Sequence, residues 1–167
     1  MPLSFRRATN TDRPAIHRLV DEVLRSYGLN LLLETSDVDL ADVEASYDAR
    51  GGTLELIEDA GGTLLGIVGW RPGEGDVWEL KKLYLSSSAR SRGIGRLALD
   101  RAIAAARAGG ARAMVLETSE NLVEANRLYT KAGFVPVTGE AAGSFATLSE
   151  ECDVAYRLEL GEPDSEG

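Results

Sequence analysis

Cysteine and histidine are almost absent from this chain, which has Cys152 and His17 as its single residues of each kind. One cysteine cannot form an intramolecular disulfide, and no His/Cys/Asp cluster has the spacing of metal ligands. No apolar run approaches the roughly 20 residues that a membrane-spanning helix needs, and the first residues lack the apolar core of a secretory signal. We therefore expect a cytoplasmic protein with no metal and no membrane association.

Basic residues are also in the minority: 18 Lys and Arg stand against 27 Asp and Glu, which gives a net charge of −9. This balance argues against a nucleic-acid partner. It is compatible with a cationic substrate, and equally with a surface that is acidic only for solubility. The length of 167 residues predicts a single domain over residues 1–160, and the acidic end, 161–167, is expected to be disordered.

The order of the expected elements predicts a mixed α+β sheet of about seven strands with about four helices. Antiparallel strands joined by short glycine-containing turns come first, then one crossover helix into a parallel strand, then a helix and a hairpin. The first helix is expected to start near Pro14 and to stop at Gly28. The other helices are expected over 38–47, 96–108 and 122–132, and strands over 3–8, 53–58, 63–70, 77–85, 113–116, 134–137 and 153–160.

A glycine-rich segment between the strand over 77–85 and the following helix is the strongest functional signal. Gly93 and Gly95 at a helix start free backbone N–H groups, and the helix dipole adds roughly 0.3–1 kcal/mol for a nearby anion. Arg90, Arg92 and Arg96 add positive side chains. The segment therefore predicts a cradle for a phosphate or pyrophosphate group.

The same glycines also fit the dinucleotide fingerprint, because Ala98 stands at its last position and Glu117 lies downstream. Three features disfavour a nucleotide-binding oxidoreductase. Residues 86–92 separate the strand from the first glycine, the strand belongs to an antiparallel meander, and the loop carries three arginines where the fingerprint relies on bare backbone.

The pattern Arg90-x-x-Gly93-x-Gly95 matches the (Gln/Arg)-x-x-Gly-x-(Gly/Ala) signature of the GCN5-related N-acetyltransferases, the GNAT superfamily. The chain resembles this family beyond the loop. Residues 79–85 look like its fourth strand, 116–118 like the end of its fifth strand, and 125–134 like its fourth helix. The resemblance implies the GNAT fold, in which the fourth and fifth strands splay apart.

The resemblance also implies acetyl-CoA as the co-substrate. Its pyrophosphate would bind the N–H groups of residues 92–96, and its pantetheine would pair with the freed main chain of residues 83–85. Asn121 stands near the position of a family asparagine but is shifted by about one residue, and Asn126 is either a second candidate or a surface residue. The cofactor-binding candidates are Leu83, Tyr84, Leu85, Arg90, Ser91, Arg92, Gly93, Ile94, Gly95, Arg96, Asn121, Asn126 and Tyr129.

Two catalytic residues follow from the same resemblance. Glu79 precedes Arg90 by 11 residues (90 − 79 = 11), which is the spacing of the glutamate base in the histone-acetylating branch. It would deprotonate the attacking amine, directly or through a water, or it is a solvent-facing residue. Tyr129 occupies the position of the tyrosine that protonates the leaving thiolate, or it is a core aromatic residue.

The implied reaction is direct transfer of acetyl to the primary amine of a small molecule or a peptide in a ternary complex. The acceptor would bind between residues 27–47 and a final hairpin over 139–151, with Glu117 and Thr118 in reach. Glu34, Asp37 and Asp39 are candidates to hold its cation, or they are solvated. The alternative is a non-catalytic acyl-CoA-binding module, and the family leaves a homodimer open.

Overall fold

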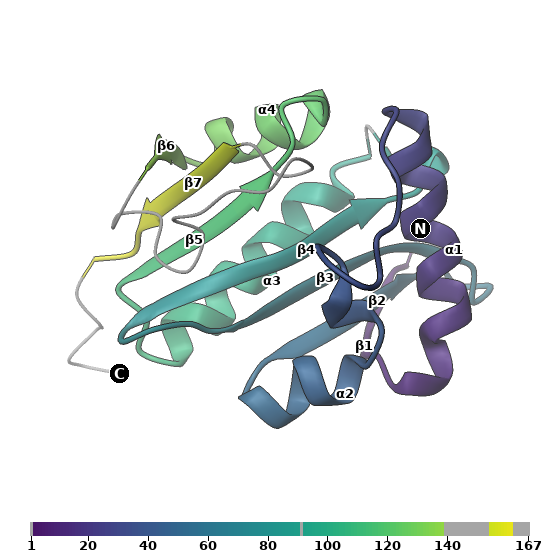
Figure 1. Cartoon of the computed structure of the whole chain (residues 1–167), viewed down its shortest axis with the longest axis horizontal. Coiled ribbons are helices and arrows are strands. Elements are labelled where there is room, and N and C mark those ends of the chain that lie inside the picture. Colours follow the sequence, from purple (N-terminus) through teal and green to yellow (C-terminus); the bar gives the residue numbers. More distant parts are fainter. Residues whose placement is uncertain (1, 91, 139–153, 162–167) are drawn as a thin grey trace.

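A computed structural model describes residues 2–90, 92–138 and 154–161 of the chain. These residues form a seven-stranded sheet in the order β1-β2-β3-β4-β5-β7-β6 (Figure 1). In the described sheet β4 and β5 are parallel and every other neighbouring pair is antiparallel, which confirms the expected mixed α+β fold. The strands are β1 Ser4–Arg7, β2 Thr53–Glu58, β3 Leu64–Pro72, β4 Val77–Leu85, β5 Ala113–Thr118, β6 Val135–Val137 and β7 Val154–Glu159.

Helices cover both faces of this sheet. One apolar core lies between α1 and the sheet, and a second lies between α3, α4 and the opposite face (Figure 1). No helix in the described ranges is both long and apolar enough to cross a membrane. The helices are α1 Arg13–Ser26, α2 Val43–Ser46, α3 Ile94–Ala108 and α4 Val123–Lys131, with short 3-10 turns Asn10–Asp12, Val38–Leu40, Asp48–Arg50 and Ser87–Ala89.

The first helix follows its sequence pattern closely. Pro14 lies in its first turn, where its missing N–H costs no hydrogen bond, and Gly28 follows its end with a φ of 78°. The buried residues recur at intervals of three and four and face the sheet; they are Ile16, Leu19, Val20, Val23 and Leu24.

The expected continuous helix over 38–47 is wrong. A 3-10 turn at Val38–Leu40 and the four-residue α2 replace it, because Asp42 breaks the helix with extended backbone and accepts a hydrogen bond from the amide of Ala45. Asn10, more than 30 residues away, accepts from the amide of Val43 and holds the second piece in place.

The splay between β4 and β5 is confirmed. The two strands pair only over Val77–Glu79 and Ala113–Val115, and beyond these residues their ends diverge (Figure 1). Strand β4 also carries one extra residue at Lys81, because Leu80 pairs with Trp70 and Lys82 pairs with Gly69 of β3. The main chain of β4 after Glu79 therefore has no strand on its β5 side.

Several expected boundaries shift by a few residues. Strand β3 continues to Pro72, so the turn to β4 is shorter than the expected loop from Arg71, and α3 starts at Ile94 rather than Arg96. The expected hairpin over 139–151 and nearly all of the expected disordered tail, 162–167, lie outside the described residues.

Candidate active site

The glycine segment forms the start of α3. Gly93 has a φ of 76°, a left-handed conformation that favours glycine, and its carbonyl accepts the first helical hydrogen bond from Leu97. Apart from Gly93 and its neighbours in the chain, no atom lies within 4 Å of the position where a Cβ of Gly93 would stand, so the backbone there faces open space. The 15-residue helix behind it directs its positive dipole end to this point.

The three arginines of the segment have different surroundings. Arg92 donates to the carbonyl oxygen of Ser88 at 3.3 Å, and Arg96 pairs with Asp100 at 3.0 Å; both arginines are exposed. Arg90 is half-buried, and its guanidinium stands 5.2 Å from the ring centroid of Tyr27. Ser91, another expected cofactor residue, lies outside the described residues.

A hollow extends from Arg90 along the freed part of β4. It encloses about 520 Å³ of empty space when its open mouth is included. The structure brings Leu83, Tyr84 and Leu85 into its wall, opposite the first turns of α4. The other lining residues are Val23, Tyr27, Arg90, Gly95, Leu122, Glu124, Ala125 and Leu128.

Tyr27 and Glu124 line this hollow and are joined by a hydrogen bond, and the sequence analysis predicted neither of them as a site residue. The hydroxyl of Tyr27, after α1, donates to the carboxylate of Glu124 on α4. This bond lowers the pKa of Glu124, while burial and the same bond raise the pKa of Tyr27. With Arg90 over the ring of Tyr27, three separate segments meet at the hollow.

Tyr129 lies on α4, beside the space between the diverging ends of β4 and β5. Its side chain is 5% exposed, its ring packs against Phe134 and Tyr156 at centroid distances of 5.9 and 6.0 Å, and it lines the space between the diverging strands. This position is compatible with both alternatives for Tyr129, the acid that protonates the thiolate and a core aromatic residue. The catalytic role of Tyr129 therefore stays a prediction.

Asn121 and Asn126 differ in exposure and in their hydrogen bonds. Asn126 donates its amide hydrogens to the carbonyls of Ser119 and Leu122 and accepts from the hydroxyl of Tyr156, so its amide N–H groups serve the protein itself. Asn121 is exposed just before α4. Contacts of Asn121 and Asn126 with a cofactor stay predictions.

Glu79 lies in the closed part of the sheet, before the splay. Its side chain is 5% exposed and its carboxylate forms an ion pair with Arg71, with 3.0 Å between Nε and Oε2. The two residues face each other across β3 and β4. Arg71 also donates to the carbonyl of Ser46, so the pair joins the sheet to α2.

Asp37 and Asp39 hold a cation, but this cation is a side chain of the chain itself. Lys82 places its Nζ 2.9 Å from Asp37 and 3.4 Å from Asp39, and all three side chains are at most 7% exposed. Asp37 also accepts from the amide of Leu32, and Asp39 accepts from the hydroxyl of Tyr47. The cluster of Lys82, Asp37 and Asp39 thus ties the segment before α2 to β4.

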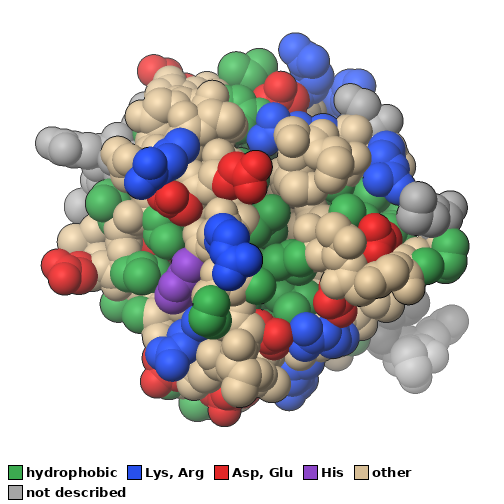
Figure 2. All heavy atoms as spheres, turned by 90° about the vertical axis from the view of Figure 1, so that its right-hand side faces the viewer, with side chains coloured by type: hydrophobic (Ala, Val, Ile, Leu, Met, Phe, Trp, Pro, Cys, Tyr) green, Lys and Arg blue, Asp and Glu red, His purple; other side chains and the backbone are tan. Residues whose placement is uncertain are grey.

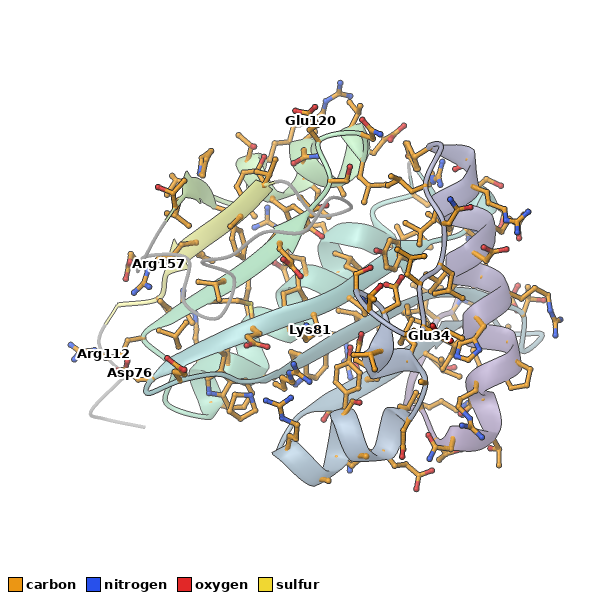
Figure 3. The ribbon with its side chains drawn as sticks, in the orientation of Figure 1. Glu34, Asp76, Lys81, Arg112, Glu120 and Arg157 are labelled. Carbon is orange, nitrogen blue, oxygen red and sulfur yellow. The ribbon has the colours of Figure 1, made fainter. Side chains whose placement is uncertain are left out.

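A second hollow opens beside this cluster, on the side of the sheet that faces α1. It holds about 470 Å³ including its mouth and shares Lys81, Lys82, Tyr84, Glu117, Thr118 and Leu122 with the space inside the splay. Lys81 projects from the middle of β4 (Figure 3). Hydrophobic side chains gather in the middle of the α1 side of the molecule, with charged side chains around them (Figure 2).

Burial shifts two of the titratable groups at the splay, Glu117 and Lys81, toward their neutral forms. It raises the pKa of Glu117, against the smaller opposing effect of the charges of Lys81 and Lys82. Burial, followed by the charge of Lys82, lowers the pKa of Lys81. Acid–base chemistry at neutral pH depends on such shifts.

Comparison with known proteins agrees with this geometry. The family model described as the acetyltransferase (GNAT) family matches residues 16–134. An uncharacterised N-acetyltransferase of Schizosaccharomyces pombe is 33% identical over 117 residues, which cover 70% of this chain and 72% of that protein. The uncharacterised N-acetyltransferase YjgM of Escherichia coli is 32% identical over 160 residues, 93% of this chain and 94% of that one.

An L-methionine sulfoximine/L-methionine sulfone acetyltransferase of Pseudomonas paraeruginosa is 28% identical over 161 residues, 89% of this chain and 92% of that one. Among solved structures, a GNAT-family acetyltransferase of Staphylococcus aureus superposes with a TM-score of 0.86 over 95% of this chain and 99% of its own, at 17% identity. A phosphinothricin acetyltransferase of Sinorhizobium meliloti, solved in complex with acetyl-CoA, has a TM-score of 0.70 at 20% identity and covers 98% and 91% of the two chains. The chain belongs to the acetyltransferase (GNAT) family.

Proposed function

We propose that this protein transfers an acetyl group from acetyl-CoA to the primary amine of a small acceptor, by direct attack of the amine in a ternary complex. The observation that carries the proposal is the opening between β4 and β5, which joins the hollow beside Arg90 to the hollow beside Glu117 through shared walls. The thioester arm of a phosphate-bearing carrier would lie along the first hollow, and the amine would enter the second.

In this proposal the pyrophosphate of CoA binds the amides at the start of α3, beside Arg90. The pantetheine pairs with the main chain of Leu83–Leu85, which lacks a strand on its β5 side. A free N–H of this main chain would stabilise the oxyanion that forms when the amine attacks the thioester. Tyr129, in the wall of the splay, would protonate the leaving thiolate.

We keep Glu79 as a proposed base, and of the two modes considered, direct or through a water, we favour the second. Its carboxylate already faces the guanidinium of Arg71 in the closed part of the sheet, so it would act through a water molecule rather than by touching the amine. In a Glu79→Gln variant this role predicts a lower rate, with the largest loss at low pH. An unchanged pH–rate profile would remove Glu79 from the mechanism.

The acceptor class tested first should be amino acids and their analogues. A relative named for L-methionine sulfoximine and L-methionine sulfone, 28% identical to this chain, supports this choice. The assay is acetyl-CoA with a panel of amino acids, polyamines and peptide amines, read by thiol release and by the mass of the acetylated product. Binding of CoA without amine-dependent thiol release would favour the non-catalytic module instead.

A further inference from the structure

Lysine is scarce in this chain, and two of its three lysines stand together at the opening of the sheet. The sequence holds Lys81, Lys82 and Lys131, and the rest of its 18 Lys and Arg residues are arginines. Lys81 is the extra residue of the bulge in β4, and Lys82 follows it. A lysine amine, unlike a guanidinium, can lose its proton when it is buried and then act as a nucleophile.

The bulge brings both lysines to the α1 side of the sheet. Successive side chains of a regular strand point to opposite faces, so neighbouring lysines would normally be separated by the sheet. Here Lys82 reaches Asp37 on the α1 side, and Leu83 after it packs into the core on the α3 side. Lys81 lines the second hollow together with Lys82. One extra residue in β4 therefore places two amines beside the hollow proposed for the acceptor.

The two neighbouring amines differ in how readily they lose a proton. Burial lowers the pKa of Lys82, but its carboxylate partners, the nearer at 2.9 Å, help to raise it above the ordinary value. Burial and the charge of Lys82 lower the pKa of Lys81, and the attraction of Asp39 and Glu79 does not offset them. At a given pH a larger fraction of Lys81 is therefore the neutral amine, the form that attacks a thioester.

The proposed carrier would approach Lys81 along β4. Its phosphate end binds at the start of α3, beyond the end of β4, and its arm pairs with the main chain of Leu83–Leu85. The arm therefore runs back along the strand, with its acyl end directed to Lys81. Lys81 precedes Leu83 by two residues, about 7 Å along a strand, and both line the space inside the splay. The thioester carbon and the Nζ of Lys81 would meet in this space.

We propose that Lys81 is a self-acetylation site, which takes the acetyl group of bound acetyl-CoA when no acceptor amine fills the second hollow. This inference rests on the proposed acetyl transfer. The neutral Nζ of Lys81 forms a C–N bond to the thioester carbon, the C–S bond breaks, and the proton that the nitrogen loses ends on the thiol of CoA. The product is an uncharged acetamide at the edge of the hollow, which excludes the acceptor and lowers its turnover.

The test incubates the wild-type protein with acetyl-CoA in the absence of amines and locates the added acetyl groups by peptide mass spectrometry. Lys81 should be acetylated on the order of tenfold or more faster than Lys131, the exposed lysine of α4, because its amine is less protonated and lies beside the thioester. Lys82 should stay unmodified. An excess of free CoA should slow the reaction of Lys81 and leave that of Lys131 unchanged, and in urea the three lysines should react alike.

A second readout follows activity in the same preparation. Amine turnover of the wild type should decline during this incubation in step with acetylation of Lys81, whereas Lys81→Arg, which cannot be acetylated there, should show no such decline. A native Lys81 that reacts no faster than Lys131, or an equal decline in Lys81→Arg, would overturn the self-acetylation. A wild type that acetylates amines while Lys81 stays unmodified would overturn it and leave the proposed function standing. A wild type that acetylates neither amines nor itself would overturn both.

Discussion

Replacement of Lys82 by methionine should destabilise the protein strongly, because it leaves Asp37 and Asp39 buried without a counter-charge. The three side chains are 4–7% exposed, and Lys82 lies 2.9 and 3.4 Å from the two carboxylates. Breaking a buried ion pair by removing one partner costs about 3–5 kcal/mol. Each carboxylate keeps one other hydrogen bond, so we expect a loss near 3 kcal/mol.

The size of the effect can be read in a thermal or urea unfolding experiment followed by circular dichroism. For a chain of this length 1 kcal/mol shifts Tm by about 2–4 °C, so the variant should melt roughly 6–12 °C lower. Lys131→Met, at the exposed end of α4, is the matched control and should stay within about 1 kcal/mol of the wild type.

The pH dependence of this loss tests its cause. Burial lowers the pKa of Lys82, but the charges of Asp39 and Asp37 help to raise it above its ordinary value, so the wild-type lysine stays charged until strongly alkaline pH. In Lys82→Met the two carboxyls can escape the penalty by protonation, and the loss should therefore shrink as the pH falls from about 7 to about 4. A loss below about 1 kcal/mol at neutral pH, or one that does not change with pH, would refute this account of the cluster.

Three further predictions concern the site. Tyr129→Phe should lower turnover with little effect on CoA affinity, measured by steady-state kinetics and calorimetry, and full turnover would rule out the tyrosine as the acid. Gly93→Ala forces a side chain into left-handed backbone at a cost of about 1–2 kcal/mol. If this cost falls on CoA binding, the affinity for CoA should decrease by about 5–30-fold. Gly62→Ala, with a φ of 82° in an open turn, should carry the same backbone cost without changing CoA affinity. Glu117→Gln should raise the free energy of unfolding at neutral pH, because burial raises the pKa of Glu117 and its charged form destabilises the folded protein. This gain in the free energy of unfolding should vanish below the ordinary pKa of a glutamate, where the side chain is protonated in both states. Urea unfolding at several pH values measures this gain, and no difference between the two proteins at neutral pH would contradict it.

The features that the sequence predicted correctly depend on neighbours in the chain. The antiparallel strands are joined by turns with glycine at Gly62 and Gly75, both with positive φ, and the crossover rule fixes β5 parallel to β4. The glycine segment is likewise local, because Gly93 sets the conformation of the residues that follow it. Short-range geometry was sufficient to place a helix soon after β4, with its start predicted at Arg96 rather than Ile94, whereas the splay beside it was implied by the family resemblance.

The features that sequence reasoning missed depend on contacts between distant segments. Lys82 meets Asp37 across 45 residues, and Asn10 holds α2, the second piece of the expected helix over 38–47, in place. The pair of Arg71 and Glu79 had a usable signal, because opposite charges stand directly across a hairpin, but the turn was predicted to begin at Arg71. Two adjacent lysines inside an apolar strand were a signal as well, since at least one of them had to be buried.

The opening of the sheet has a consequence for proton transfer that neither strand has alone. In water a glutamate with a pKa of about 4.3 and a lysine-type amine near 10.4 differ by about six units, or about 8 kcal/mol against moving a proton from the amine to the carboxylate. Burial at the splay raises the pKa of Glu117 and lowers that of Lys81, a side chain with the same chemistry as a primary-amine acceptor. An acceptor amine placed there, as the proposed function requires, would be subject to the same burial, and each unit by which the two pKa values converge would lower the cost by about 1.4 kcal/mol. In the proposed reaction, the divergence of β4 and β5 would therefore offer a free main chain to the thioester and a half-buried setting that lowers the cost of deprotonating the amine.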